Sequence, residues 1–251
     1  MDSRSAWLDA APLVIAHRGA SAVAPENTLP AFEQAAALGA EAVELDAKRT
    51  LDGEVVAFHD RTLHRTTGGE GSVGSRSLRD LRRLDAGAWK SDAFRGTPIP
   101  TLGEVLETVG RRLLVNVELS DYWGVQARLV ERVVEIVRAH RMTGRVLFSS
   151  FDSGALAVAR QLAPEIPRGH LFGPTPLAYR DLLRRRVPVA ALHPHESRVR
   201  RDRIEAAHRS GRRVHVYTVL QEERMRTFWA WGVDGLITDL PDLARRVRDE
   251  S

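Results

Sequence analysis

The sequence predicts a single (β/α)8 barrel (a TIM barrel), and three observations support this fold class. The chain has 251 residues, 43% of them hydrophobic, which is enough for one large domain with a sizeable core. Short apolar runs alternate along it with amphipathic stretches of helical period. Eight such runs fit into the length, and eight parallel strands close a barrel. A doubly wound open sheet is the alternative architecture.

The apolar runs are the predicted strands, and helical segments separate most of them. In chain order the strands are expected at 13–16, 42–47, 113–119, 145–149, 168–172, 187–192, 213–219 and 235–238. Two helices have clear signals. One covers residues 28–38, with Asn27 placed to cap it, and the other covers residues 126–140, with apolar residues at helical spacing.

One interval, residues 60–99, breaks the alternation. It is rich in Gly, Ser and Thr and then in Pro, as loops are. Its stretch TGGEGSVG lacks the Lys-Ser/Thr ending of a phosphate-binding loop, so it is a weak motif. We therefore expect one domain over residues 1–251, with a small insertion at about 60–99 after the second strand.

Composition excludes several kinds of site and partner. The chain has no cysteine, so disulfides and thiolate metal sites are excluded, and any metal must be held by oxygen or histidine. Residues 1–12 carry acidic residues and no long apolar stretch, unlike a signal peptide, and no apolar run is long enough to span a membrane. A soluble cytoplasmic protein is the expectation.

The net charge of +4 comes mostly from arginine. Runs such as 184–186 and 198–203 lack interleaved aromatic residues and have acidic residues among them, so we interpret them as solvated helix faces and expect no nucleic-acid partner. Weak contact with an anionic membrane surface or substrate stays open. Nothing in the sequence indicates the oligomeric state.

Charged residues gather at the ends of the first three predicted strands. Glu44 and Asp46 are two apart on a strand and face the same way, where burial of like charges is costly without a cation. Hard carboxylates at a barrel mouth favour a divalent ion such as Mg²⁺ or Ca²⁺. Pairing with Arg or Lys at the rim explains these two residues equally well. Glu118, near the end of the third strand, adds a third carboxylate for the same ion.

A predicted β-hairpin after the second strand would bring His59 toward these carboxylates. If Asp52 and Gly53 form a two-residue turn, His59 lies directly opposite Asp46. A bulge would shift that register by one residue, and a surface histidine is the alternative interpretation. His17 and Arg18 follow the first strand, so the predicted mouth combines two imidazoles for acid–base chemistry with an arginine fork for phosphate. This set suits metal-assisted phosphoryl chemistry.

The sequence as a whole resembles the glycerophosphodiester phosphodiesterase family. The stretch HRGASAVAPENTLPAFEQAAALGAEAVELDAKRTLDGEVVAFHD is similar to that family's N-terminal signature. The motifs IPTLGEVL, FSSFD and GVDGLITDLPD follow in the family's order, so the resemblance extends from residue 13 to about 243. It implies a (β/α)8 barrel with a small insertion after the second strand.

The resemblance also implies roles for matching residues. His17 and His59 fit the catalytic histidines, and Arg18 fits the phosphate-contacting arginine. The divalent-metal ligands are matched by Glu44, Asp46 and Glu118. The implied reaction is hydrolysis of a glycerophosphodiester to glycerol 3-phosphate and an alcohol. The glycerol hydroxyl attacks the phosphate, and water then opens the resulting cyclic phosphate.

The sequence departs from the family in two places. Ser120 stands where the family usually has Lys, so a cation expected near the phosphate is missing. Lys48 shares a strand face with Glu44 and Asp46, and partial replacement by Lys48 is one interpretation. We instead expect a solvated rim lysine and a real gap in positive charge, because Lys48 lies on another strand and would have to reach across the metal. Tyr217 replaces Trp on strand seven and is expected to offer the substrate an apolar wall or to be a plain rim aromatic. Tyr122 and Trp123 could cover the site. His193 and His195 could face the mouth, though loop histidines more often have no role.

Two other functions stay open. A lipid enzyme of the phospholipase D type, cutting lysophospholipids, would need an apolar apron at the mouth. A catalytically inactive barrel acting as a binding module is supported only by the absence of Lys at position 120, and the retained acid–base and metal residues argue against it.

Overall fold

The structure is a computed structural model that describes residues 5–10, 12–121, 126–174 and 188–250. Its sheet runs β1-β9-β8-β7-β6-β5-β4-β2, and β1 also pairs with β2, which closes eight parallel strands into a barrel. The predicted fold class is confirmed, and the open sheet is excluded. The strands are β1 (Leu13–Ala16), β2 (Ala42–Arg49), β3 (Val55–Ala57), β4 (Leu114–Leu119), β5 (Val146–Ser150), β6 (Arg168–Phe172), β7 (Ala191–Pro194), β8 (Arg213–Val216) and β9 (Gly235–Thr238).

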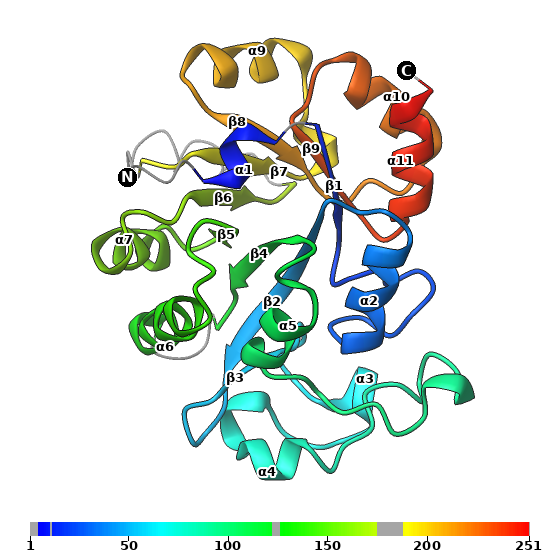
Figure 1. The fold of residues 1–251 in the computed structure, drawn as a ribbon, viewed down its shortest axis with the longest axis vertical. Coiled ribbons are helices and arrows are strands. Elements are labelled where there is room, and N and C mark those ends of the chain that lie inside the picture. The colour runs from blue at the N-terminus through cyan, green and yellow to red at the C-terminus, as the bar shows by residue number, and fades with distance from the viewer. Residues whose placement is uncertain (1–4, 11, 122–125, 175–187, 251) are drawn as a thin grey trace.

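Helices surround the strands, and the short helices of the predicted insertion lie together beside β3 (Figure 1). The helices are α1 (Ala6–Asp9), α2 (Leu29–Ala37), α3 (His64–Thr67), α4 (Leu78–Leu81), α5 (Leu102–Val109), α6 (Gln126–Ala139), α7 (Ser153–Leu162), α9 (Arg201–Arg209), α10 (Glu222–Ala230) and α11 (Pro241–Asp249), with 3-10 turns η1 (Val73–Ser75), η2 (Asp92–Phe94) and η3 (Glu196–Arg198). Within the described ranges, no helix has the length and apolar character that a bilayer crossing requires.

Helix α1 closes the N-terminal end of the barrel. Trp7 on this helix is fully buried against the first residues of several strands, among them Leu13, Ala42 and Leu114. Its indole Nε1 donates a hydrogen bond to the carbonyl of Arg145, 2.9 Å away. Because side chains fill this end, the chemistry of the fold belongs at the opposite, C-terminal end.

The β2–β3 hairpin differs from the predicted register by one residue. Arg49 pairs with Val55, and the amide of Thr50 donates to the carbonyl of Glu54, so three residues rather than two form the turn. Gly53 ends that turn with φ +93°, as the last residue of a three-residue hairpin loop does. Asp46 therefore lies opposite Phe58, and the prediction that His59 lies directly opposite Asp46 is wrong.

The interior of the barrel contains buried histidines that the sequence did not predict. His193 lies within β7 rather than in a loop after it, is fully buried, and does not reach the mouth. The Nδ1 of His215 on β8 lies 3.1 Å from the Nε2 of His193. Burial lowers the pKa of both side chains, that of His215 to about 4 although the charge of Asp234 acts in the opposite direction. Both imidazoles are therefore neutral at pH 7.

Because these histidines are buried in the neutral form, we expect the protein to lose stability against unfolding in mild acid. An unfolded His binds a proton below about pH 6.5, whereas folded His215 does so only near pH 4, so the free energy of unfolding falls as the pH falls between these values. The loss attributable to His215 is about 3 kcal/mol. Chemical denaturation at pH 7 and pH 4.5 should show a smaller difference for His215→Gln than for the unchanged protein. An unchanged difference would contradict a neutral buried His215.

Candidate active site

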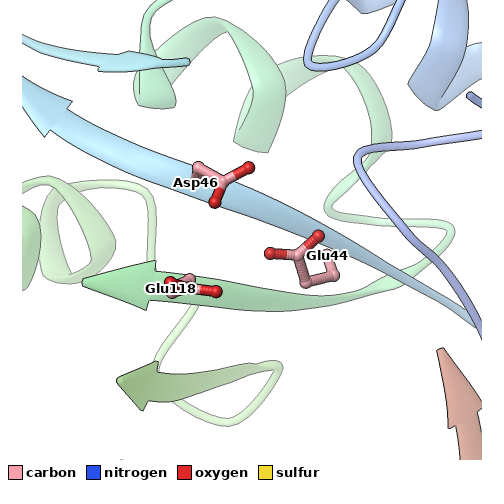
Figure 2. A group of neighbouring side chains, drawn as sticks. All are labelled: Glu44, Asp46 and Glu118. Carbon is pink, nitrogen blue, oxygen red and sulfur yellow. The ribbon is translucent and has the colours of Figure 1, made fainter. Parts of the chain in front are cut away.

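Three carboxylates from adjacent strands lie together near the C-terminal end of the barrel. Glu44 and Asp46 lie on one face of β2, and Asp46 pairs in register with Glu118 on β4. One oxygen from each of the three side chains lies within 4.8 Å of the other two. Figure 2 shows the three carboxylates around the space between β2 and β4. The sequence prediction that these residues meet is confirmed.

The chemistry of this cluster fits one divalent cation. Two oxygens bound to one Ca²⁺ are at most about 5 Å apart, so the spacing within 4.8 Å suits Ca²⁺. Two oxygens bound to Mg²⁺ are at most about 4 Å apart, so the side chains would have to move closer together to hold that ion. Glu44 is 4% exposed and Asp46 is 2% exposed. Burial and the charges of Asp46 and Glu118 raise the pKa of Glu44 well above its ordinary value. The ionised form of Glu44 is therefore disfavoured in the absence of a cation, and a bound divalent ion would favour it.

Arg18 neutralises part of this charge, as the alternative interpretation of the carboxylates expected. Its Nε lies 3.4 Å from Oδ2 of Asp46, and its backbone amide donates to Glu44 at 3.0 Å. Although burial raises the pKa of Asp46, the charge of Arg18 contributes to a net lowering. A sharp turn after β1 places this arginine, and a Cβ on Gly19 would lie 2.6 Å from the backbone of Ala31. Only glycine fits there, which explains the His-Arg-Gly sequence at the strand end.

Asn27 has a different role from the predicted helix cap. Helix α2 begins one residue later, with Thr28 as the N-cap residue. The side chain of Asn27 instead donates to Oδ2 of Asp46 at 2.8 Å and accepts the backbone amide of Asp46 at 3.3 Å. This pair of hydrogen bonds orients the Asp46 carboxylate, so Asn27 supports the acidic cluster. The sequence signal that could have indicated this role is the position of Asn27 within the stretch that resembles the family's N-terminal signature.

His17 is held by an aspartate from the other end of the chain. Its Nδ1 lies 2.7 Å from Oδ1 of Asp239, the residue directly after β9. Burial alone would raise the pKa of Asp239, but the hydrogen bond and charge of His17 give a net lowering. An ionised Asp239 fixes the proton on Nδ1 and leaves Nε2 for proton transfer. No role was predicted for Asp239 from the sequence, although Asp239 lies within the motif GVDGLITDLPD.

His59 reaches the same end of the barrel despite the altered register. Its charge is close enough to contribute to the lowered pKa of Asp46. The Nδ1 of His59 lies 2.7 Å from Asp60, and hydrogen bonds from Arg65 lower the pKa of Asp60 to about 2. Arg65 also binds Glu26 at 2.7 and 2.8 Å.

Glu26 completes this network. It accepts a hydrogen bond from Nη1 of Arg18 at 2.8 Å, so an unbroken chain of ion pairs joins His59 to Arg18. Burial raises the pKa of Glu26, yet the hydrogen bonds from Arg65 and the charge of Arg18 lower it overall. Glu26, Asp60 and Arg65 were not predicted. The sequence gives no sign that the loop containing Glu26 meets the segment that carries Asp60 and Arg65.

Tyr217 lies at the edge of the same site. Its ring contacts those of Phe151 and His195 edge-on, with centroids 6.0 and 5.7 Å away. Burial and the nearby charge of Glu118 raise the pKa of Tyr217, which stays protonated. Both the apolar-wall and the rim-aromatic interpretations stay compatible with this position. Tyr122 and Trp123 lie outside the described residues.

Lys48 is buried, and the expectation of a solvated rim lysine is wrong. It is 9% exposed, and its Nζ donates to the backbone oxygen of Ser120 at 2.8 Å and to its Oγ at 3.4 Å. Burial lowers the pKa of Lys48, while Asp46 and Glu118 act in the opposite direction. The ammonium therefore lies within electrostatic range of the acidic cluster, beside the position where the sequence suggested a missing cation.

Comparisons with known proteins agree with this geometry. Residues 17–243 match the model of the glycerophosphoryl diester phosphodiesterase family. A glycerophosphodiester phosphodiesterase of Caldanaerobacter subterraneus subsp. tengcongensis is 36% identical, over 92% of this chain and 95% of the relative. One of Bacillus subtilis is 31% identical, over 94% and 86%. A phosphodiesterase structure from Oleispira antarctica, in complex with the product sn-glycerol-3-phosphate, is 34% identical, with a TM-score of 0.88 over 95% of this chain and 97% of that one. The chain belongs to the glycerophosphoryl diester phosphodiesterase family.

Proposed function

We propose that this enzyme hydrolyses glycerophosphodiesters to glycerol 3-phosphate and an alcohol, with one divalent ion, Mg²⁺ or Ca²⁺, held by Glu44, Asp46 and Glu118. The observation that carries the proposal is the convergence of three carboxylates, two histidines and Arg18 at one barrel mouth. The relatives with this activity and the product held by the Oleispira enzyme support the substrate class. The chain acts as a single catalytic domain with an insertion at about 60–99.

The side chains divide the reaction between them. One imidazole, of His17 or His59, accepts the proton of the glycerol hydroxyl beside the phosphate, and that oxygen attacks phosphorus. The other imidazole protonates the leaving alcohol oxygen, and water then opens the cyclic phosphate to glycerol 3-phosphate. Arg18 donates to phosphoryl oxygens. When bound, the divalent ion supplies positive charge to the developing phosphoryl charge.

One observation favours a lipid substrate as a second candidate. The exposed large hydrophobic side chains of the described residues lie in segments that follow barrel strands or in the insertion; they are Val23, Leu51, Trp89, Phe151 and Leu220. Segments after the strands of a barrel surround its active end. Exposed apolar side chains in such segments suit contact with an acyl chain, as a lysophospholipid-cutting enzyme requires.

A substrate panel separates these functions. Glycerophosphodiesters with different head groups and matched lysophospholipids are incubated with the metal-loaded enzyme, and phosphate monoesters are measured. We expect glycerol 3-phosphate from the water-soluble diesters at a higher kcat/KM than lysophosphatidic acid from the lysolipids. The reverse order would favour the lipid enzyme, and no turnover of either class would favour an inactive barrel.

A further inference from the structure

We propose that Lys48, held by Ser120, is a further substrate-contacting residue that donates a charge-assisted hydrogen bond to the phosphoryl group of the bound diester. This inference rests on the proposed function. Ala47 pairs with Leu119 directly after the Asp46–Glu118 pair, so Lys48 and Ser120 follow two positions beyond the carboxylates and on the same strand faces. The amine is thus fixed one step nearer the barrel opening than the acidic cluster.

The hydrogen bonds of Lys48 leave it able to bind a ligand. Among the described residues, its ammonium donates to Ser120 through two hydrogen bonds, whereas an ammonium has three N–H groups. A side chain that is 9% exposed and bound to a neutral partner is costly to keep charged. An anionic ligand within reach of the third N–H would compensate for that cost.

Lys48 also borders open space. It lines a cleft of about 340 Å³ together with Thr50, Arg61, Asp121 and the loop at 72–75. The lining of this cleft does not include the three carboxylates, which lie further along β2 and β4. Lys48 is linked to them by its place on the same face of β2 and by the charges of Asp46 and Glu118 that act on its ammonium.

The balance of charges with metal and substrate bound also favours a role for Lys48. One divalent ion would balance two of the three carboxylate charges, and Arg18 is shared between Asp46 and Glu26, so the negative charge of a bound diester calls for a further cation. Lys48 supplies that charge within range of Asp46 and Glu118. On this arrangement no gap exists at Ser120, and a lysine added there would crowd the existing ammonium.

A double-mutant cycle tests the proposal by exchanging the two residues. We expect Lys48→Ser to lower kcat/KM about 10- to 100-fold, the effect of one charge-assisted hydrogen bond. Ser120→Lys alone should bring no gain. The exchange variant K48S/S120K should recover activity to within about fivefold of the unchanged enzyme, because its new lysine side chain begins at residue 120, whose backbone lies beside the present position of the Lys48 ammonium. Lys48→Gln, which keeps a neutral donor near Ser120, should lose activity like Lys48→Ser if the charge is what matters.

A chemical measurement tests the contact without relying on turnover. The chain has two lysines, Lys48 and Lys90, so amine acetylation can be followed at each by mass spectrometry. Metal and sn-glycerol 3-phosphate should slow acetylation of Lys48 severalfold, while Lys90, which donates to the backbone of Ser21, serves as the matched control. Absence of protection, or folded, metal-binding Lys48→Ser and Lys48→Gln variants with unchanged kcat/KM, would overturn the proposal. If the unchanged enzyme cleaved no glycerophosphodiester, the proposed function would fail, whereas protection by the phosphate ligand would still identify Lys48 as an anion contact.

Discussion

Removing the divalent ion is expected to lower glycerophosphodiester hydrolysis on the order of 10³-fold or more, because the ion contributes several kcal/mol of charge stabilisation to the transition state. Without it, three carboxylates within 4.8 Å would also repel the anionic substrate. The measurement is turnover after exhaustive chelation, followed by separate restoration with Mg²⁺ and Ca²⁺. Full turnover by the chelated enzyme would contradict the metal assignment.

Matched variants connect this loss to the acidic cluster. Glu44→Gln keeps the shape of a buried ligand but removes its charge, whereas Glu135→Gln removes an exposed carboxylate of α6. Added ion should raise the melting temperature of the unchanged enzyme and of Glu135→Gln, and much less that of Glu44→Gln. In the metal-free state Glu44→Gln should be the more stable protein, because one of three like charges is gone. A normal ion response in Glu44→Gln would place the ion elsewhere.

His17→Ala and His59→Ala are each expected to lower kcat by roughly 10²- to 10⁴-fold, the usual contribution of a general acid or base. Neither imidazole belongs to the carboxylate cluster, so the affinity for the ion should stay nearly unchanged. Asp239→Asn should lower kcat by less than His17→Ala, because it keeps the imidazole but loses the charged acceptor on Nδ1. Steady-state kinetics with calorimetric titration of the ion measures both quantities.

A substrate with a nitrophenyl leaving group separates the two histidines. Nitrophenolate leaves without a proton, so the variant that lacks the general acid should be partly rescued and the variant that lacks the base should not. Equal rescue of both variants, or of neither, would count against the division of acid and base roles between His17 and His59.

The fold could be predicted because its signals are local. The run 13–16 matches β1, since a buried parallel strand is often a continuous apolar stretch. The range predicted at 168–172 matches β6, although only its last two residues, Leu171 and Phe172, are large and apolar. The strand expected at 187–192 is instead β7, Ala191–Pro194. The hairpin register was wrong because an Asp-Gly pair fits either a two-residue turn or the end of a three-residue turn. Side-chain hydrogen bonds such as that from Thr50 to Asp52 decide between the two, and they are not visible in a local pattern.

The site was predictable where its residues lie on strands. Glu44, Asp46 and Glu118 meet because strand alternation and parallel register bring them together. The residues that hold the site in place lie outside the strands, in loops and on α3: Asn27 binds Asp46, Asp239 binds His17, and Arg65 binds Asp60 and Glu26. Lys48 was misjudged because a lysine at a strand end is usually solvated, and only the tertiary fold shows the carbonyl of Ser120 within its reach.

The most direct measurement is phosphorus NMR of glycerophosphoethanolamine incubated with metal-loaded enzyme, with chelated enzyme and with His17→Ala. We expect the diester signal to give way to glycerol 3-phosphate with the loaded, unchanged enzyme, and to persist over the same period in the other two samples. A diester signal that persists with folded, metal-loaded enzyme, or that disappears equally fast after chelation, would contradict metal-dependent glycerophosphodiester hydrolysis at this site.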